Sequence, residues 1–225
     1  AIMATDTWPK ETAFKGLVGN DEILIGGITK GAGMIHPNMA TMLAFLSTDV
    51  SITQPLLQAS LREAVDYSFH CITIDRDTST NDMVLLFANG KKGKTITRTG
   101  PRYHQFTSLL KMACLSLAKM LIKDAEGATK IIEIQITGAK QDTAARKIAF
   151  AIANSLLVKT AFFGEDANWG RIIAAIGNSE VKVLPEEISL FFGPTQLVKN
   201  GVYLGADAEQ KISHYLKNKE IFLKL

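Results

Sequence analysis

The segment at residues 30–50, KGAGMIHPNMATMLAFLSTDV, carries the residue types best suited to chemistry. A glycine-rich loop leads through Pro37 to the small residue Ala40, and then to Thr41, whose hydroxyl stands at the start of an apolar run. If the Thr41 hydroxyl attacked and broke the Ala40–Thr41 bond, Thr41 would gain an α-amino group beside its own Oγ. Such an amine has a pKa of ~7.7–8.0 against ~10.4 for lysine, so it can take the hydroxyl proton near neutral pH. The same pattern also fits a threonine that only begins a strand.

The segment ANGKKGKT at residues 88–95 resembles a phosphate-binding loop, because it follows an apolar strand and ends in Gly-Lys-Thr. The phosphate-loop pattern requires glycine where Ala88 stands, and a helix directly after the loop. Here ITRTGPR follows, and its glycine and proline oppose a helix. The sequence therefore predicts a hairpin turn beginning at Asn89-Gly90, with solvated lysines around it.

The segment DRDTSTND at residues 75–82 resembles the start of a calcium loop, with Asp75, Asp77 and Ser79 at alternate positions. Thr80 replaces the glycine of that motif, and Leu86 replaces its bidentate glutamate. The segment therefore predicts a tight loop whose side chains bind backbone donors, or alternatively the frame of a pocket.

Metal-ligand spacing is missing from the histidines and cysteines. The four histidines are scattered, at positions 36, 70, 104 and 214. Cys71 and Cys114 lie in apolar stretches and are expected to be buried. No G-x-S-x-G nucleophile motif is present. We therefore predict neither a metal site nor a hydrolase of that type.

Strands and helices are mixed along the chain, without a regular strand–helix–strand cadence. Strands or short apolar core segments are expected at residues 22–28, 42–47, 71–74, 83–88, 131–136, 181–184, 188–192 and 220–225. Helices are expected at residues 55–69, 102–122, 143–154 and 208–216, with a glycine-rich turn and a short helix in FFGEDANWGRIIAAIG. The loop after the strand at 22–28 would then deliver Thr41 to the next apolar run.

Composition excludes several classes of protein. The 225 residues are 47% hydrophobic and 21% charged, which is typical of a globular chain of one or two domains. Lysine and arginine exceed aspartate and glutamate by only 25 to 22, so no strong field favours nucleic acid or an anionic membrane. No apolar run reaches the ~20 residues of a membrane span, and no leader is evident, so a cytoplasmic or organelle-matrix location is expected.

Five separated segments together resemble the bifunctional ornithine acetyltransferase (glutamate N-acetyltransferase) family of the cyclic arginine pathway. They are IMATDTWPKE, GGITKGAGMIHPNMATMLAF, IDRDTSTNDMVLLFANG, LAKMLIKDAEGATK and IANSLLVKTAFFGEDANWGRIIAAIG, in the family's order. The resemblance is strong from Ala1 to about Gly177 and looser to Leu225.

This resemblance implies an α/β (α+β) fold, a layered helix–sheet–sheet–helix sandwich similar to self-processing N-terminal nucleophile proteins. It also implies self-cleavage at Ala40–Thr41, which divides the chain into residues 1–40, the end of an α chain, and 41–225, a β chain that starts with its nucleophile. An upstream segment and a C-terminal tail would then be absent from these residues.

The implied reaction is a ping-pong acetyl transfer without metal or organic cofactor. Thr41 would take the acetyl group from N2-acetylornithine and hold it as an ester, and glutamate would then accept it. Some family members also accept acetyl-CoA as donor. The implied assembly is an α2β2 heterotetramer, without nucleic-acid or membrane partners.

Two further site residues follow from the resemblance. The family's substrate lysine falls on Lys30, whose cation can pair with a substrate carboxylate, and its glutamate falls on Glu126, which suits an ammonium group. Four positions depart from the family pattern: Ala4 stands for a substrate-contacting threonine, Ala125 and Arg76 for glycine, and His70 for asparagine. The family's oxyanion-stabilising Thr-Gly pair lies in the upstream segment, and its C-terminal substrate contacts would follow Leu225.

Two other functions stay open on the sequence. One is a threonine-nucleophile amidohydrolase or aminopeptidase of related fold, because sequence does not show whether water is excluded from the ester. The other is a degenerate binding protein that does not cleave itself, which the loss of a threonine at Ala4 makes conceivable.

Overall fold

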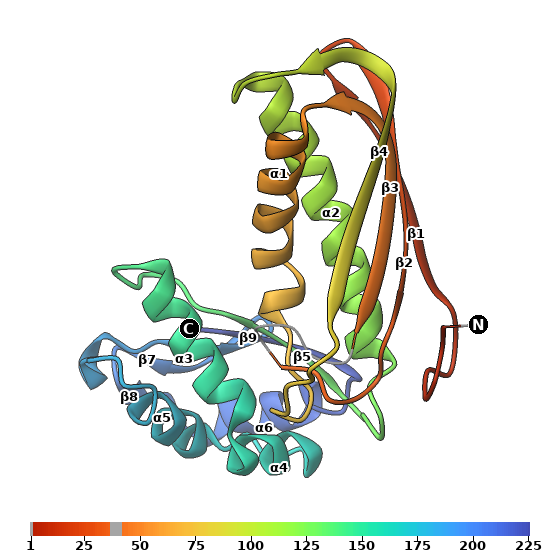
Figure 1. Cartoon of the computed structure of the whole chain (residues 1–225). Helices are drawn as coiled ribbons and strands as arrows, with labels where there is room; N and C mark the ends of the chain where they lie inside the picture. The colour runs from red at the N-terminus through yellow and green to blue at the C-terminus, as the bar shows by residue number, and fades with distance from the viewer. Residues whose placement is uncertain (1, 37–41) are drawn as a thin grey trace. The chain divides into compact units, whose positions relative to one another are not determined.

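A computed structural model of the chain describes residues 2–36 and 42–225. The chain divides into two compact units, Ala1–Gly127 and Ala128–Leu225, and each is described by itself (Figure 1). Ala40 and Thr41, the predicted cleavage site, lie outside the described residues. The boundary between the units differs from the predicted cleavage point because it marks where the chain packs separately, not where it would be cut.

Unit 1 is built on a four-stranded sheet. Its strands are β1 (Lys10–Val18), β2 (Asp21–Lys30), β3 (Leu43–Ile52) and β4 (Met83–Ile96), in the spatial order β1-β2-β3-β4. The pairs β1–β2 and β2–β3 are antiparallel, whereas β3 and β4 are parallel. Because parallel strands need a crossover, α1 (Gln54–Asp66) and the short 3-10 helix η1 (Phe69–Cys71) lie between them in sequence.

Two helices cover one face of this sheet, α1 and α2 (Pro101–Lys123), as Figure 1 shows. The helices cover this face because alternate strand residues on it are apolar and need to be buried. In β2, for example, Ile23 and Ile25 are buried in the core, whereas Leu24 between them is exposed. Of the helices in the described residues, only α2 is long and apolar enough to cross a membrane. Its fully buried side chains, such as Phe106 and Leu117, fill the core of unit 1.

Unit 2 has a five-stranded sheet in the order β5-β9-β6-β7-β8. Its strands are β5 (Ile131–Gln135), β6 (Leu190–Phe192), β7 (Thr195–Lys199), β8 (Val202–Tyr203) and β9 (Glu220–Lys224), of which only β5 and β9 pair in parallel. Its helices are α3 (Asp142–Asn154), α4 (Leu156–Phe163), α5 (Trp169–Gly177), the 3-10 helix η2 (Pro185–Glu187) and α6 (Ala206–Tyr215). A second apolar cluster, which includes Ile152, Leu197 and Leu223, forms its core.

Two helices of unit 2 begin at a capping side chain. The Ser155 hydroxyl accepts a hydrogen bond from the Val158 amide at the start of α4, and the Asn168 side chain accepts one from the Arg171 amide at the start of α5. These caps satisfy amide groups that have no partner inside the helix, and so they fix where each helix begins.

The predicted hairpin turn at Asn89-Gly90 is wrong, because β4 runs through it. Thr48 of β3 pairs with Ala88, and Val50 pairs with Lys92. Between these two pairs β4 advances by four residues, whereas β3 advances by two. Gly90 (φ +70°) takes a left-handed conformation at this bulge. Such a bulge absorbs extra residues without ending the strand, and glycine adopts its backbone angles without strain.

The predicted strand at 71–74 is also wrong. This segment is held by loop residues instead: the Ile74 amide donates to the Ile35 carbonyl at 2.8 Å, and Thr73 Oγ1 lies 3.1 Å from His36 Nδ1. Cys71, expected to be buried, is exposed, whereas Cys114 is buried as predicted. The apolar stretch at 181–184 forms no strand. The predicted fold class, α/β with two sheets flanked by helices, is confirmed.

Candidate active site

The loop between β2 and β3 starts and ends at one place on the sheet of unit 1. Lys30, the last residue of β2, pairs in register with Leu43, the first residue of β3. The loop of twelve positions between them therefore begins and ends at this residue pair. Both ends of this β2–β3 loop are described, at residues 31–36 and at Met42.

The first residues of the β2–β3 loop are anchored from two directions. The Gly31 amide donates to Asp6 Oδ1 at 2.7 Å, and the Ala32 carbonyl accepts from the Glu126 amide at 2.8 Å. Gly31 and Ala32 are both buried. The N-terminal segment and the residues just after α2 thus both bind the backbone that directly follows Lys30.

A buried ion network, formed by Lys10, Asp6 and Asp124, supports these anchors. Lys10 Nζ lies 2.5 Å from Asp6 Oδ1 and 2.5 Å from Asp124 Oδ2, and the three side chains are 0%, 1% and 3% exposed. Thr7 donates to Asp124 through its amide, at 2.9 Å, and through its hydroxyl. Trp8 places its ring against the Lys10 ammonium, with 5.5 Å from Nζ to the ring centroid.

Hydrogen bonding decides the pKa of both acids in this network. Burial raises the pKa of Asp6, but hydrogen bonds from the Gly31 amide, Lys10 and the Ala4 amide outweigh it, so the pKa lies below its usual value. Burial also raises the pKa of Asp124, and the hydrogen bonds from Lys10 and Thr7 likewise outweigh it. Both carboxylates are therefore charged at neutral pH and are occupied in holding the chain.

Lys30 and Glu126, the two predicted substrate residues in the described chain, flank the backbone of residues 31–33. Lys30 is half-buried at the end of β2, and Glu126 is exposed just after α2. The Glu126 carboxyl group packs so closely on Gly33 that a Cβ at that position would stand 3.1 Å from Glu126 Oε2. The absence of a side chain at residue 33 therefore lets the carboxylate lie against the loop.

Two aspartates from the segment 75–82 bind the β2–β3 loop. Asp75 accepts hydrogen bonds from the Met34 amide at 2.5 Å and the Ile35 amide at 3.1 Å. Met34 has φ +55°, a left-handed conformation that is uncommon for a residue with a side chain, and the bond to Asp75 fixes it. Asp82 Oδ1 accepts from the Met42 amide at 2.7 Å.

Asp82 differs from the other acids around this loop. Its Oδ2 atom is buried and receives no hydrogen bond from any described residue. Burial raises the pKa of Asp82, and the Met42 amide and the charge of Lys30 only partly offset that effect. The sequence indicated this segment only as a tight loop or a pocket frame, and it gave no sign that Asp75 and Asp82 bind opposite ends of the β2–β3 loop.

The remaining motifs have structural explanations. Asp75 also binds the Asp77 amide, and Ser79 binds the Asn81 amide, so the prediction that this loop satisfies its own backbone donors is confirmed. Within residues 2–36 and 42–225, no three His, Cys, Asp or Glu side chains lie together as metal ligands would. The phosphate-loop-like segment is strand β4, which no helix directly follows.

Two departures from the family pattern have visible consequences. Arg76, which stands for a glycine, has φ +74°, in the left-handed region that glycine prefers. Ala4, which stands for a threonine, still uses its backbone, since its amide donates to Asp6 Oδ2 at 3.2 Å. Neither feature depends on the side chain, since one is a backbone angle and the other a backbone hydrogen bond.

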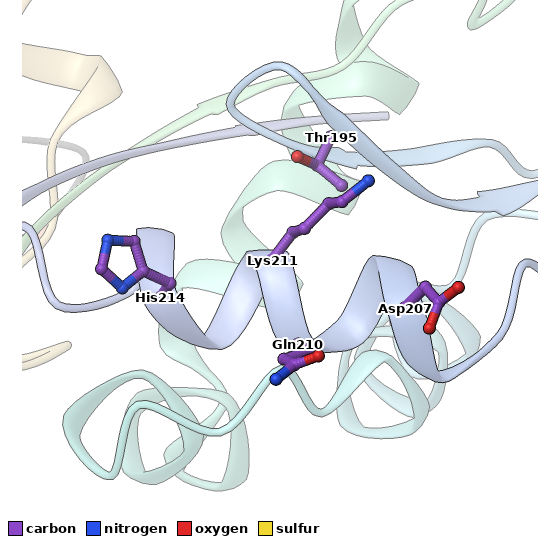
Figure 2. A pocket seen from close by; sticks show the side chains of 5 residues that line it. All are labelled: Thr195, Asp207, Gln210, Lys211 and His214. Carbon is purple, nitrogen blue, oxygen red and sulfur yellow. The ribbon is translucent and has the colours of Figure 1, made fainter.

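Unit 2 has an open surface hollow of its own. Thr195, Asp207, Gln210, Lys211 and His214 line it, and Figure 2 shows that four of them come from α6 and Thr195 from β7. It contains none of the predicted site residues.

The described chain is thus a two-sheet α/β protein in which lysine and acidic side chains of unit 1 gather around a glycine-rich loop. A family model described as "ArgJ family" matches residues 1–225. The chain belongs to the ArgJ family.

Curated relatives and a solved structure agree with this assignment. The arginine biosynthesis bifunctional protein ArgJ of Geobacter sulfurreducens is 49% identical over 221 residues, which are 98% of this chain and 56% of that protein. The protein of the same name from Bacillus subtilis is 50% identical over 201 residues, 89% of this chain and 50% of that protein. The crystal structure of the bifunctional protein from Bacillus halodurans matches with a TM-score of 0.73 and 41% identity, covering 80% of this chain and 85% of that one. This chain spans about half the length of the curated relatives it matches.

Proposed function

We propose that the protein containing these residues is an acyltransferase of arginine biosynthesis, which moves an acetyl group from N2-acetylornithine to glutamate. Membership of the ArgJ family supports the pathway. The observation that carries the site is that Lys30 and Glu126 flank the anchored backbone of residues 31–33, just ahead of Ala40 and Thr41 in the sequence.

Self-cleavage is the first chemical step of the proposal. The Thr41 Oγ attacks the Ala40 carbonyl carbon, its proton passes to the departing peptide nitrogen, and an ester replaces the amide. Water then hydrolyses the ester, which leaves a carboxylate on Ala40 and a free amine on Thr41. The products are residues 1–40 and 41–225, each with whatever chain precedes or follows it in the complete protein.

Acetyl transfer then uses the same hydroxyl twice. Thr41 Oγ attacks the acetyl carbonyl of N2-acetylornithine while its amine takes the hydroxyl proton, and ornithine leaves with a proton on its nitrogen. The amine of glutamate next attacks the acetyl ester and restores the free hydroxyl. Lys30 would pair with a substrate carboxylate, and Glu126 would pair with the substrate's ammonium group.

The partners and location of the protein are part of the same proposal. The cleaved chains assemble as an α2β2 heterotetramer, and the protein acts in the cytoplasm, or in an organelle matrix in a eukaryote. The sequence left open whether acetyl-CoA also serves as donor, and replacing N2-acetylornithine by acetyl-CoA in the transfer assay decides it. No metal, organic cofactor, nucleic acid or membrane takes part in the proposed reaction.

The decisive experiment follows cleavage and turnover in the complete protein. Wild type should yield two chains, the second starting at Thr41, and should form ornithine from N2-acetylornithine only when glutamate is present. Thr41→Ala should stay uncut and inactive, whereas Thr95→Ala, at an exposed threonine of β4, should behave as wild type. Ornithine release at the same rate without glutamate would instead identify an amidohydrolase, and a permanently uncut wild type would identify a binding protein.

The substrate residues are tested by matched pairs. Lys30→Met and Glu126→Gln should raise KM about tenfold or more while cleavage continues, because each removes a charge-assisted contact of ~1.5–3 kcal/mol. Lys15→Met and Glu22→Gln change an exposed ion pair, 2.8 Å long, on the same sheet. These two controls should leave KM unchanged. Unchanged kinetics in Lys30→Met and Glu126→Gln would remove both residues from the substrate site.

A further inference from the structure

The buried ion network connects the two segments that carry the proposed substrate residues. One of its acids, Asp6, accepts a hydrogen bond at 2.7 Å from the amide of Gly31, which directly follows Lys30. Its other acid, Asp124, stands directly after α2, two positions before Glu126. The ammonium group between the two acids lies 2.5 Å from an oxygen of each, so charge-assisted hydrogen bonds bridge the segments.

A second contact joins the same two segments. The Glu126 amide donates to the Ala32 carbonyl at 2.8 Å. A single hydrogen bond would let the segments turn about it, whereas the ion network holds them at a second point. The backbone after Lys30 and the backbone before Glu126 are therefore fixed in both spacing and direction.

Burial and full hydrogen bonding make this connection rigid. The side chains of Asp6, Lys10 and Asp124 are 1%, 0% and 3% exposed. The second oxygen of Asp6 accepts the Ala4 amide at 3.2 Å, and Thr7 donates to both oxygens of Asp124. Because every carboxylate oxygen of the network accepts a hydrogen bond, neither acid can turn without losing one.

Stability alone does not account for ions at this place. Desolvation offsets most of the attraction in a buried ion network, and well-packed apolar side chains of the same volume are often at least as stable. Charge-assisted hydrogen bonds add direction, because each is made at a short distance and a defined angle. What this network supplies, and an apolar core would not, is a fixed geometry between residues 31 and 124.

We propose that the ion network positions Lys30 and Glu126 at a fixed separation, and that this separation selects the side-chain length of the amino-acid substrate. This inference rests on the proposed function, in which Lys30 pairs with a carboxylate and Glu126 with an ammonium group. In N2-acetylornithine three methylene groups separate the α-carbon from the only ammonium group. N2-acetyllysine has one more, which lengthens it by about 1.3 Å. Two charges held at a fixed separation cannot pair equally well with both.

The ratio of kcat/KM for these two acetyl donors measures the selection. One methylene group typically changes kcat/KM about 10–200-fold, so the complete, cleaved wild type should prefer N2-acetylornithine by a factor in this range. Lys10→Met removes the ammonium group and leaves two carboxylates facing each other, so the separation is no longer fixed. We expect the KM of N2-acetylornithine to rise about tenfold, since a misplacement of 1 Å can cost 10²-fold. The KM of N2-acetyllysine should change little, so the preference should shrink about tenfold.

Asp6→Ala is the second variant, in case Lys10→Met does not fold. It removes the acceptor of the Gly31 amide but leaves Lys10 paired with Asp124, so no buried charge is left without a partner. The link between the two segments is broken here as well. The preference for N2-acetylornithine should therefore shrink in the same direction.

Two controls separate positioning from folding. Leu110→Ala creates a cavity in α2, about four turns before Asp124, and so destabilises unit 1 without touching the network. Lys15→Met removes an exposed ion pair on the same strand as Lys10. A less stable protein contains less active enzyme, which lowers kcat/KM for both donors by one factor. Both controls should therefore keep the wild-type preference.

Each outcome decides the proposal. A smaller preference in the cleaved network variants, with the wild-type preference in both controls, supports it. Equal losses for the two donors overturn it and leave the network a structural role, and so does a wild type that uses both donors equally. Network variants that fold but stay uncut also overturn it, because the network would then serve cleavage. A wild type that does not act on N2-acetylornithine refutes the proposed function itself, and the selection of length falls with it.

Discussion

Replacing Lys10 by methionine tests whether the buried ion network holds unit 1 together. The change keeps a long apolar side chain but leaves Asp6 and Asp124, 1% and 3% exposed, without the ammonium group 2.5 Å from each. Removing one partner of a buried ion pair typically costs ~3–5 kcal/mol, because the charge left behind is desolvated and unpaired. Hydrogen bonds from Gly31 and Thr7 stay with the two acids, so we expect about 3 kcal/mol.

The sequence provides a fluorescent probe for this unit. It has two tryptophans, Trp8 and Trp169, and Trp8 stacks on Lys10 itself. In a Trp169→Phe background, urea unfolding followed by Trp8 fluorescence reports unit 1 alone, which avoids treating a two-unit chain as one transition. With a urea m-value of about 2 kcal/mol/M, a loss of 3 kcal/mol moves the midpoint down by about 1.5 M.

Lys15→Met is the control for this measurement. Lys15 also lies on β1, but its ion pair with Glu22 is 62% and 54% exposed, and such pairs contribute ~0–1 kcal/mol. The Lys10→Met deficit should also shrink as the pH falls toward 4, because the unpaired acids then take up protons. Equal midpoints for the two variants at neutral pH, or a deficit independent of pH, would refute the argument that buried charge holds this unit.

Three further predictions concern the same region. Gly33→Ala should raise KM several-fold with little change in stability. The Cβ of the new alanine would stand 3.1 Å from Glu126 Oε2 and displace that flexible carboxylate. Steady-state kinetics measures the change in KM, and thermal melting measures the stability. Asp82→Asn should raise the melting temperature at neutral pH. An acid whose pKa is raised by folding destabilises the fold when it is charged, and asparagine removes that charge. An unchanged or lowered melting temperature would contradict this. Asp6 and Asp124 have lowered pKa values, so the stability that their charges contribute is complete above pH 3.8, their usual pKa, and is lost as the pH falls below it. Circular dichroism in acid should therefore show unit 1 unfolding below this pH, and Asp124→Asn should make its stability depend less on pH.

Helical periodicity predicted most of the fold, and long-range pairing accounts for what it missed. The helices α1, α2, α3 and α6 lie close to their expected bounds because each has an apolar stripe at helical spacing. Strand β1 was missed because lysine occupies its inward position 10, where an alternating strand would carry an apolar residue. That lysine is buried between Asp6, which is near in sequence, and Asp124, which is 114 positions away and completes the pairing. Local sequence does not contain this information.

Turn signals were less reliable than periodicity. Asn89-Gly90 has the residues of a tight hairpin, but the same residues also suit a bulge inside a strand, and the pairing of β4 with β3 selects the bulge. The run at 71–74 has strand-forming residues, but its hydrogen bonds go to Ile35 and His36 of the β2–β3 loop. In both cases the partner segment decides the conformation.

The predicted site residues came from the resemblance, whereas their supports came only from the structure. Lys30 and Glu126 were expected from their motifs, and the structure adds that they flank residues 31–33. The roles of Asp75 and Asp82 had no sequence signal beyond a polar loop, because each acts by binding a backbone amide about 40 positions away. Backbone amides are the same at every residue, so sequence alone cannot identify which one an acid binds.

The acids around the β2–β3 loop separate into two kinds by how fully they are hydrogen-bonded. Asp6 and Asp124 each receive several hydrogen bonds and the Lys10 charge, so their pKa values fall and their charge stabilises the fold. Asp82 is desolvated with one hydrogen bond, so its pKa rises and its charge destabilises the fold. Neutralising Asp124 should therefore weaken unit 1, whereas neutralising Asp82 should strengthen it. Opposite signs of these two changes in unfolding free energy would show that the number of hydrogen bonds, and not burial alone, decides whether an acid stabilises unit 1.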